Sequence, residues 1–182
     1  MKALQLTILA AVAALFLVPQ AKAETSSELR RQAEKALHRL YRNNSGARVI
    51  GDKAIAVLVF PTVYKAGFIG GAQTGNGVLF RNGKVEGYYN TTALSYGLQA
   101  GIQKFSYALF FLDEKSLHYL NKSGGFELGG APSLVVAKEG FMAGMYTTTL
   151  QKGIYAFFFG QEGLMGGIGI QGTKISQYTP SE

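Results

Sequence analysis

The sequence contains no cysteine and only two histidines among its 182 residues. Without cysteine there is no disulfide, no thiolate metal site, no cysteine nucleophile and no cysteine to carry a lipoprotein anchor. The two histidines, His38 and His118, fall outside His-Glu-x-x-His and comparable metal-ligating spacings. A G-x-S-x-G nucleophile elbow and a Walker phosphate loop are also missing, and the spacing of the 11 acidic residues suggests no catalytic pair. We therefore expect a protein that is not an enzyme and that uses no metal or cofactor.

The first 23 residues have the pattern of an export signal. Lys2 precedes an unbroken apolar run, Ile8–Val18, which is too short to span a bilayer as a helix. Pro19 ends the run, and Ala21-Lys22-Ala23 places small residues at the two positions that a signal peptidase reads. We expect cleavage after Ala23, no transmembrane span in the mature chain, and a location in the periplasm or at the surface of the cell envelope.

Glycine divides the mature sequence into two parts. All 24 glycines lie from Gly46 onward, and each glycine disfavours a helix interior by about 1 kcal/mol relative to alanine. Before that point, apolar residues recur at the spacing of one helix face, and Thr25 with Glu28 makes a capping box. This pattern predicts an N-terminal helix over residues 26–43.

Beyond Gly46, short apolar runs separated by glycine predict strands over residues 46–175. Asn82-Gly83 has the composition of a two-residue hairpin turn. A short helix is expected at Glu114–Asn121, with Asp113 as its N-cap. The expected strands are residues 54–60, 78–81, 84–86, 93–102, 107–112, 133–137, 141–146, 154–159 and 167–170. The predicted fold class is α+β: a strongly bent antiparallel sheet or barrel-like β core with an N-terminal amphipathic helix and one short additional helix.

Positive charge is concentrated near the start of the mature chain. The whole chain has 18 Lys and Arg against 11 Asp and Glu, and removing Lys2 and Lys22 with the signal leaves a net charge of +5. In the predicted helix the apolar residues fall in one arc and the basic residues mostly in the opposite arc, with only two acids. A solvated helix normally intersperses acids among its bases, so this imbalance favours contact with an anionic surface. The candidate lipid-binding residues are Arg30, Arg31, Lys35, Arg39 and Arg42 of the helix, followed by Arg48 and Lys53.

The apolar arc of this helix allows two arrangements. It is narrow and shallow because Ala33 and Ala36 contribute to it. It can insert between lipid headgroups, or it can pack on the sheet and leave only the cations facing lipid; we favour packing. Five cations near an anionic bilayer contribute roughly 3–5 kcal/mol, which suits reversible binding to a surface. Nucleic acid is not expected as a partner, because export separates the protein from it.

Several sequence blocks resemble the SYLF domain family. Residues 54–61 (AIAVLVFP), together with residues 65–68 (KAGF) and 70–71, resemble the first signature block. Residues 87–90 (GYYN), 95–101 (SYGLQAG) and 110–111 are similar to the second. Residues 123–129 (SGGFELG), with Phe126 where a tryptophan is common, and residues 163–167 (GLMGG) with Gly172 resemble the third and closing blocks. The resemblance covers about residues 29–175.

The resemblance implies a lipid-binding module and not an enzyme. Eukaryotic members bind phosphoinositides, with an N-terminal amphipathic helix implicated, and some associate with actin. Only the basic helix carries over to this chain, because residues 158–162 (FFGQE) stand where members often have a lysine-bearing segment. An export signal also removes the protein from actin, and in a bacterial envelope the anions would be phosphatidylglycerol, cardiolipin or lipopolysaccharide.

We therefore predict a signal peptide over residues 1–23 and a single SYLF-like domain over residues 24–182. The predicted function is peripheral, non-catalytic binding of anionic lipid, through phospholipid or phosphoinositide-type headgroups. The alternative is a structural or interaction protein of the envelope that binds a protein partner.

Overall fold

The computed structural model describes residues 24–67, 70–96, 101–121, 125–131, 133–137, 152–163 and 172–182. The signal expected at residues 1–23 and the strands expected at residues 141–146 and 167–170 lie outside these ranges. The described part of the chain begins with two helices, α2 (Ser26–Asn43) and α3 (Ser45–Gly51), and another helix, α4 (Glu114–Leu120), follows the fourth strand. A short 3-10 helix spans Leu128–Gly130.

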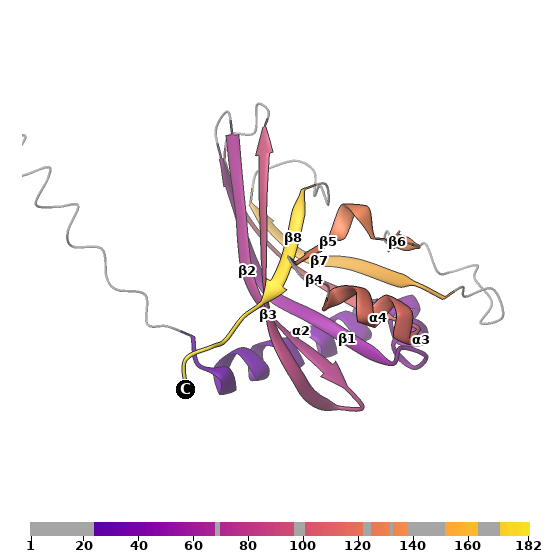
Figure 1. Ribbon diagram of the computed structural model, residues 1–182. Helices are drawn as coiled ribbons and strands as arrows, with labels where there is room; N and C mark the ends of the chain where they lie inside the picture. Colours follow the sequence, from indigo (N-terminus) through magenta and orange to yellow (C-terminus); the bar gives the residue numbers. More distant parts are fainter. Residues whose placement is uncertain are drawn as a thin grey trace, which may run out of the picture.

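The strands form one strongly curled sheet (Figure 1). They are β1 (Ala56–Gly67), β2 (Gly70–Arg81), β3 (Lys84–Tyr96), β4 (Gly101–Phe111), β5 (Phe126–Glu127), β6 (Leu134–Ala137), β7 (Ile154–Gly163) and β8 (Thr173–Gln177). Their order across the sheet is β5-β8-β3-β2-β1-β4-β7-β6. The long central strands β1 to β4 bend along their length, and irregular register in the β1–β2, β1–β4, β2–β3 and β4–β7 pairs accompanies the bend.

The sheet buries side chains on both faces. Alternate residues of β1, such as Val57 and Val59, pack with α2 and α3, whereas Leu58 and Phe60 point to the other face, which α4 covers. We call these the α2 face and the α4 face. Apolar runs in the central strands are continuous because both faces are covered.

Pro61 marks a shift in this alternation. The register of β1 slips between Val59 and Thr62 against β2, and between Phe60 and Val63 against β4. Proline has no N–H for a ladder hydrogen bond and is therefore accommodated at a bulge. The carbonyl oxygen of Pro61 accepts a hydrogen bond from the Ser106 hydroxyl at 2.7 Å. We predicted a strand over residues 54–60, but the bulge at Pro61 lets β1 continue to Gly67.

Several sequence predictions are confirmed. Residues 26–43 are helical, and the Thr25 hydroxyl accepts a hydrogen bond from the Glu28 amide at 3.3 Å. The α4 helix begins after Asp113, whose carboxylate accepts a 2.8 Å hydrogen bond from the Ser116 amide. Asn82 and Gly83 both have positive φ, as a two-residue hairpin turn requires. The α+β class and the strong bend are also as predicted.

Three details of the predicted fold are wrong. The sheet is mixed and not antiparallel, because β6 pairs with β7 in parallel. Residues 93–102 are not one strand: β3 ends at Tyr96 and β4 begins at Gly101. The glycine-rich β region does not begin at Gly46, because α3 occupies Ser45–Gly51. The Asn44 side chain caps α3, accepting a 2.9 Å hydrogen bond from the Ala47 amide.

The end of the chain returns to the start of α2. The Ser26 amide donates a 3.1 Å hydrogen bond to the Ser181 carbonyl, and the Ser181 hydroxyl donates a 3.2 Å hydrogen bond to the Glu24 carbonyl. Figure 1 shows the C-terminus beside this first turn. The C-terminal residues therefore help to position the beginning of α2.

Candidate functional site

The α2 helix packs on the sheet along one narrow side. Leu29, Ala33, Ala36 and Leu40 are buried against the α2 face. Two of these four are alanines, so the helix backbone lies close to β1 and β2. The sheet thus covers the apolar side of α2, which is not free to insert into lipid. This is the packed arrangement that we favoured from the sequence.

Three of the predicted cations project from the opposite side of α2. Arg31, Lys35 and Arg42 are exposed, and steps of 100° per residue place them within about 40° of one another, facing away from the buried stripe. None of them forms an ion pair with another residue that the structure describes. We call Arg31, Lys35 and Arg42 the cationic face of α2.

The other predicted cations have different surroundings. Arg30 Nε donates a 2.8 Å hydrogen bond to Glu34 Oε1, so its charge is balanced on the same helix. Glu34 also raises the pKa of the Arg30 guanidinium. Arg48 lies on α3 and directs Nη2 to the Tyr41 carbonyl at 3.4 Å, and Lys53 is exposed after the end of α3. The seven predicted residues therefore do not form one uniform surface.

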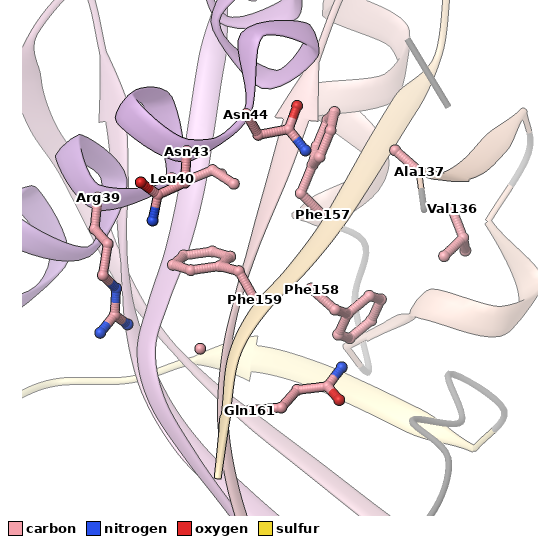
Figure 2. Close-up of a pocket in the computed structure, with 11 residues that line it drawn as sticks. Arg39, Leu40, Asn43, Asn44, Val136, Ala137, Phe157, Phe158, Phe159 and Gln161 are labelled. Atoms are coloured by element: carbon pink, nitrogen blue, oxygen red, sulfur yellow. The ribbon is translucent and has the colours of Figure 1, made fainter. Parts of the chain in front are cut away.

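Arg39 lies at the edge of a pocket between α2 and the β6–β7 edge of the sheet (Figure 2). Its Nη2 donates a 3.2 Å hydrogen bond to the Ser106 hydroxyl, and its guanidinium carbon lies 5.7 Å from the centre of the Phe159 ring. The Ser106 hydroxyl is itself held by the Pro61 carbonyl. This chain of contacts fixes the direction of the Arg39 side chain although Arg39 lies at the surface.

We call this cavity the Arg39 pocket. It has a volume of about 570 Å³. Three aromatic residues and Val136 contribute its apolar wall, and Arg39 with three side-chain amides contributes its polar groups. Its lining residues are Arg39, Leu40, Asn43, Asn44, Val136, Ala137, Phe157, Phe158, Phe159, Gly160 and Gln161.

Gly160 gives the Arg39 side chain its space. This residue has φ +63°, a left-handed conformation that favours glycine, and a Cβ built on it would lie 2.7 Å from Arg39 Nη2. Any larger residue would strain the backbone and displace the guanidinium. The local sequence Phe-Phe-Gly therefore supplies both a ring for the cation to lie over and room for the cation to do so.

The pocket combines one cation, hydrogen-bonding amides and an apolar wall. A guanidinium binds phosphate or carboxylate oxygens strongly, and neighbouring amides can donate further hydrogen bonds. The aromatic wall can accept the first carbons of an apolar chain. Such a site suits an amphipathic anion. From the sequence we identified Arg39 but not the rest of the pocket, because Ser106 and residues 157–161 come from strands far along the chain.

A separate row of buried polar side chains crosses the α4 face beyond the bulge. Lys65 lies opposite Gln73 on β2 and Gln103 on β4, and all three are more than nine-tenths buried. Gln103 Oε1 and the Thr173 hydroxyl have no hydrogen-bond partner among the described residues. Sequence reasoning missed this row because Lys65 turns inward only through the register shift at Pro61. It lies on the face away from α2 and does not contribute to the cationic face.

The described residues contain no cluster of three or more His, Asp or Glu side chains that could hold a metal ion. Both His38 and His118 are exposed. In α2, burial raises the pKa of Tyr41 to about 12, with a further contribution from Asp52, so the phenol stays neutral near neutral pH. No helix within the described ranges is both long and apolar enough to cross a bilayer.

Comparison with known proteins identifies one family. Residues 92–181 match the family model Ysc84, described as Las17-binding protein actin regulator. The match includes most of the second block of the resemblance together with the third and closing blocks, whereas the first block at residues 54–71 precedes it. No curated protein matches the chain.

Proposed function

Because this chain belongs to the SYLF domain family, to which the Ysc84 model corresponds, we propose that it binds anionic lipid at a membrane surface. Binding would use the cationic face of α2 and the Arg39 pocket, and would involve no catalysis. The observation that carries the proposal is that Arg31, Lys35 and Arg42 face away from the sheet without an acidic partner among the described residues.

The packing of α2 supports peripheral attachment. Its four buried apolar residues are already used against the sheet, so membrane contact through this helix depends on charge. Each Lys or Arg near an anionic bilayer contributes about 1 kcal/mol. Three such residues correspond to roughly two decades in partitioning, and salt should weaken the binding because exposed charges are screened over about 8 Å at physiological ionic strength.

The Arg39 pocket would hold one headgroup. Its guanidinium is oriented by Ser106 and Phe159 before any ligand arrives, so little side-chain entropy remains to be lost on binding. A phosphate oxygen would be placed at the guanidinium, and the glycerol and first acyl carbons beside Phe159 and Val136. We also propose that the chain is exported in a bacterial cell, where the anions it could meet are phosphatidylglycerol, cardiolipin and lipopolysaccharide.

Co-sedimentation with vesicles tests the proposal. The protein comprising residues 24–182 is mixed with vesicles of phosphatidylglycerol and phosphatidylcholine, and the fraction bound is compared with that of an Arg31→Glu/Lys35→Glu/Arg42→Glu variant. We expect the variant to bind at least a hundredfold more weakly. A matched variant, Lys84→Glu/Lys115→Glu/Lys174→Glu, makes the same change in net charge at exposed sites on other elements and should lose much less. Equal losses in the two variants would mean that only net charge matters and would contradict a role for α2.

The description of the matched family model favours a second candidate, because it names binding to a protein, Las17. Under this candidate the chain would be a structural or interaction protein of the envelope. Its attachment would then be unaffected by the lipid composition of the vesicles.

A further inference from the structure

Four neighbouring strands present a row of exposed apolar side chains near one end of the sheet. The row consists of Leu94 on β3, Ala72 on β2, Ala66 on β1 and Ile102 on β4. Ala66 lies opposite both Ala72 and Ile102, and Ala72 lies opposite Leu94. The alanines are exposed, and Leu94 and Ile102 are 70% and 69% exposed. We call these four residues the tip row.

The tip row lies on the α2 face and continues toward the Arg39 pocket. Along β4, the side chains on this face are Ser106, Lys104 and Ile102, which alternate with the buried Phe105 and Gln103 of the other face. Ser106 contacts Arg39. A path on one sheet face thus leads from the pocket guanidinium through Lys104 to the tip row.

The residues between the pocket and the tip row are amphipathic. Tyr64, which is 53% exposed, lies opposite Lys104 across the β1–β4 pair. Lys104 is 3.9 Å from Glu162, but both side chains are well exposed, so this pair is weak. From the tip row toward the pocket, the side chains on this face change from aliphatic to Tyr and Lys and then to Arg. Side chains at a membrane follow the same order, with aliphatic residues at the acyl boundary and Tyr, Lys and Arg among the headgroups.

We infer that the tip row enters the acyl boundary of an anionic bilayer while Lys104, Arg39 and the cationic face of α2 stay among the headgroups. This inference rests on the proposed function and adds a second, apolar contact to it. The strands β3, β2, β1 and β4 are hydrogen-bonded to their neighbours at the tip row. The backbone groups between these strands therefore stay paired when the tip row enters lipid. Binding would then have a salt-sensitive part from the cations and a salt-resistant part from Leu94 and Ile102.

Labelling at single cysteines tests the inference, because the chain has no cysteine of its own. Leu94→Cys, Ile102→Cys and, as a control, Lys115→Cys each carry an environment-sensitive fluorophore. Lys115 is an exposed residue of α4, on the opposite side of the sheet. On adding phosphatidylglycerol and phosphatidylcholine vesicles we expect a blue shift at positions 94 and 102 and none at 115. Binding without any shift at 94 and 102 would overturn the inference and leave the proposed function intact.

Affinity provides an independent measurement. Burying one aliphatic side chain of this size contributes about tenfold in binding when insertion is partial, so Leu94→Ser/Ile102→Ser should bind roughly thirtyfold to a hundredfold more weakly. Its remaining binding should stay salt-sensitive, whereas Val49→Ser, a partly exposed aliphatic residue of α3, should bind as the parent does. If Leu94→Ser/Ile102→Ser binds as tightly as the parent, the tip row does not enter lipid.

Two further outcomes separate the possible failures. If the parent protein binds no anionic vesicles at all, both the inference and the proposed function are wrong. A blue shift at positions 94 and 102 that grows with protein concentration in the absence of vesicles would show that a second copy covers the tip row, and would overturn lipid as its occupant.

Discussion

Substituting Gly160 by alanine tests how the Arg39 pocket is built. At φ +63° an alanine costs roughly 1–2 kcal/mol in backbone strain. Its Cβ would also lie 2.7 Å from Arg39 Nη2, and the guanidinium would have to leave Ser106 and the Phe159 ring. Losing one partly exposed hydrogen bond and one exposed cation–π contact costs about 1 kcal/mol more. We therefore expect Gly160→Ala to lower the free energy of unfolding by about 2–3 kcal/mol.

Two other glycines serve as matched controls for this experiment. Gly83 has φ +72° but no atom near its missing Cβ, so Gly83→Ala should show the backbone strain alone, again about 1–2 kcal/mol. Gly130 has neither a positive φ nor a close neighbour, so Gly130→Ala should be close to neutral. Urea denaturation of the three variants measures the differences.

The same variants in an Arg39→Ala background complete the test. Without the guanidinium, Gly160→Ala should cost no more than Gly83→Ala does. If Gly160→Ala is no more damaging than Gly83→Ala in the presence of Arg39, the contacts of Arg39 with Ser106 and Phe159 contribute nothing, and the description of a fixed guanidinium is wrong.

Other variants test separate parts of the structure. Burial opposes ionisation of Asp113, but hydrogen bonds from Ser116 outweigh it and lower the pKa of the Asp113 carboxyl. The ionised carboxylate therefore stabilises the fold above the ordinary pKa of Asp. This stabilisation is lost as pH falls through the lower pKa of the folded state. Asp113→Asn should accordingly be less stable than the parent at pH 7, and urea denaturation should show this gap closing in acid. Tyr107→Phe should lower the free energy of unfolding by about 1–2 kcal/mol, because the fully buried Tyr107 hydroxyl donates a 2.7 Å hydrogen bond to the Thr91 hydroxyl. Adding Thr91→Val should recover part of that loss, because it removes the buried hydroxyl that Tyr107→Phe leaves without this partner. Thr25→Ala should cost about 1 kcal/mol by removing the α2 cap, which helix content during thermal unfolding would report.

Local signals in the sequence account for the parts of the fold that were predicted. The α2 helix follows from its apolar spacing and the Thr25 cap, and α4 follows from Asp113. The Asn82-Gly83 turn follows from the positive φ that both residues tolerate. Each of these features depends on residues within a few positions of one another, where propensity and capping dominate.

The features that were missed depend on contacts between distant segments. The α3 helix contains Gly46, which argues against a helix locally, but Gly46 and Ala47 are buried and the Asn44 side chain caps the turn. The pairing of β6 with β7 in parallel links residues on either side of positions 138–153. Such tertiary contacts override local propensity and leave no pattern in a short window.

The candidate site shows the same division. The cationic face of α2 could be predicted because its charges lie on one helix. The Arg39 pocket could not, since Ser106 is 67 positions from Arg39 in the sequence. The tip row was also missed, because the bulge at Pro61 changes which residues of β1 face outward. Simple alternation from the start of the strand would place Tyr64 and Ala66 on the α4 face.

The dependence of vesicle binding on lipid charge and salt decides whether the cations of α2 bind anionic lipid. The partition coefficient of residues 24–182 is measured on vesicles of phosphatidylglycerol with phosphatidylcholine and on vesicles of phosphatidylcholine alone, each at low and at high salt. We expect a preference of about a hundredfold for the anionic vesicles at low salt, most of which disappears at high salt. Equal partitioning to both kinds of vesicle at low salt would contradict a lipid-binding role for the cations of α2.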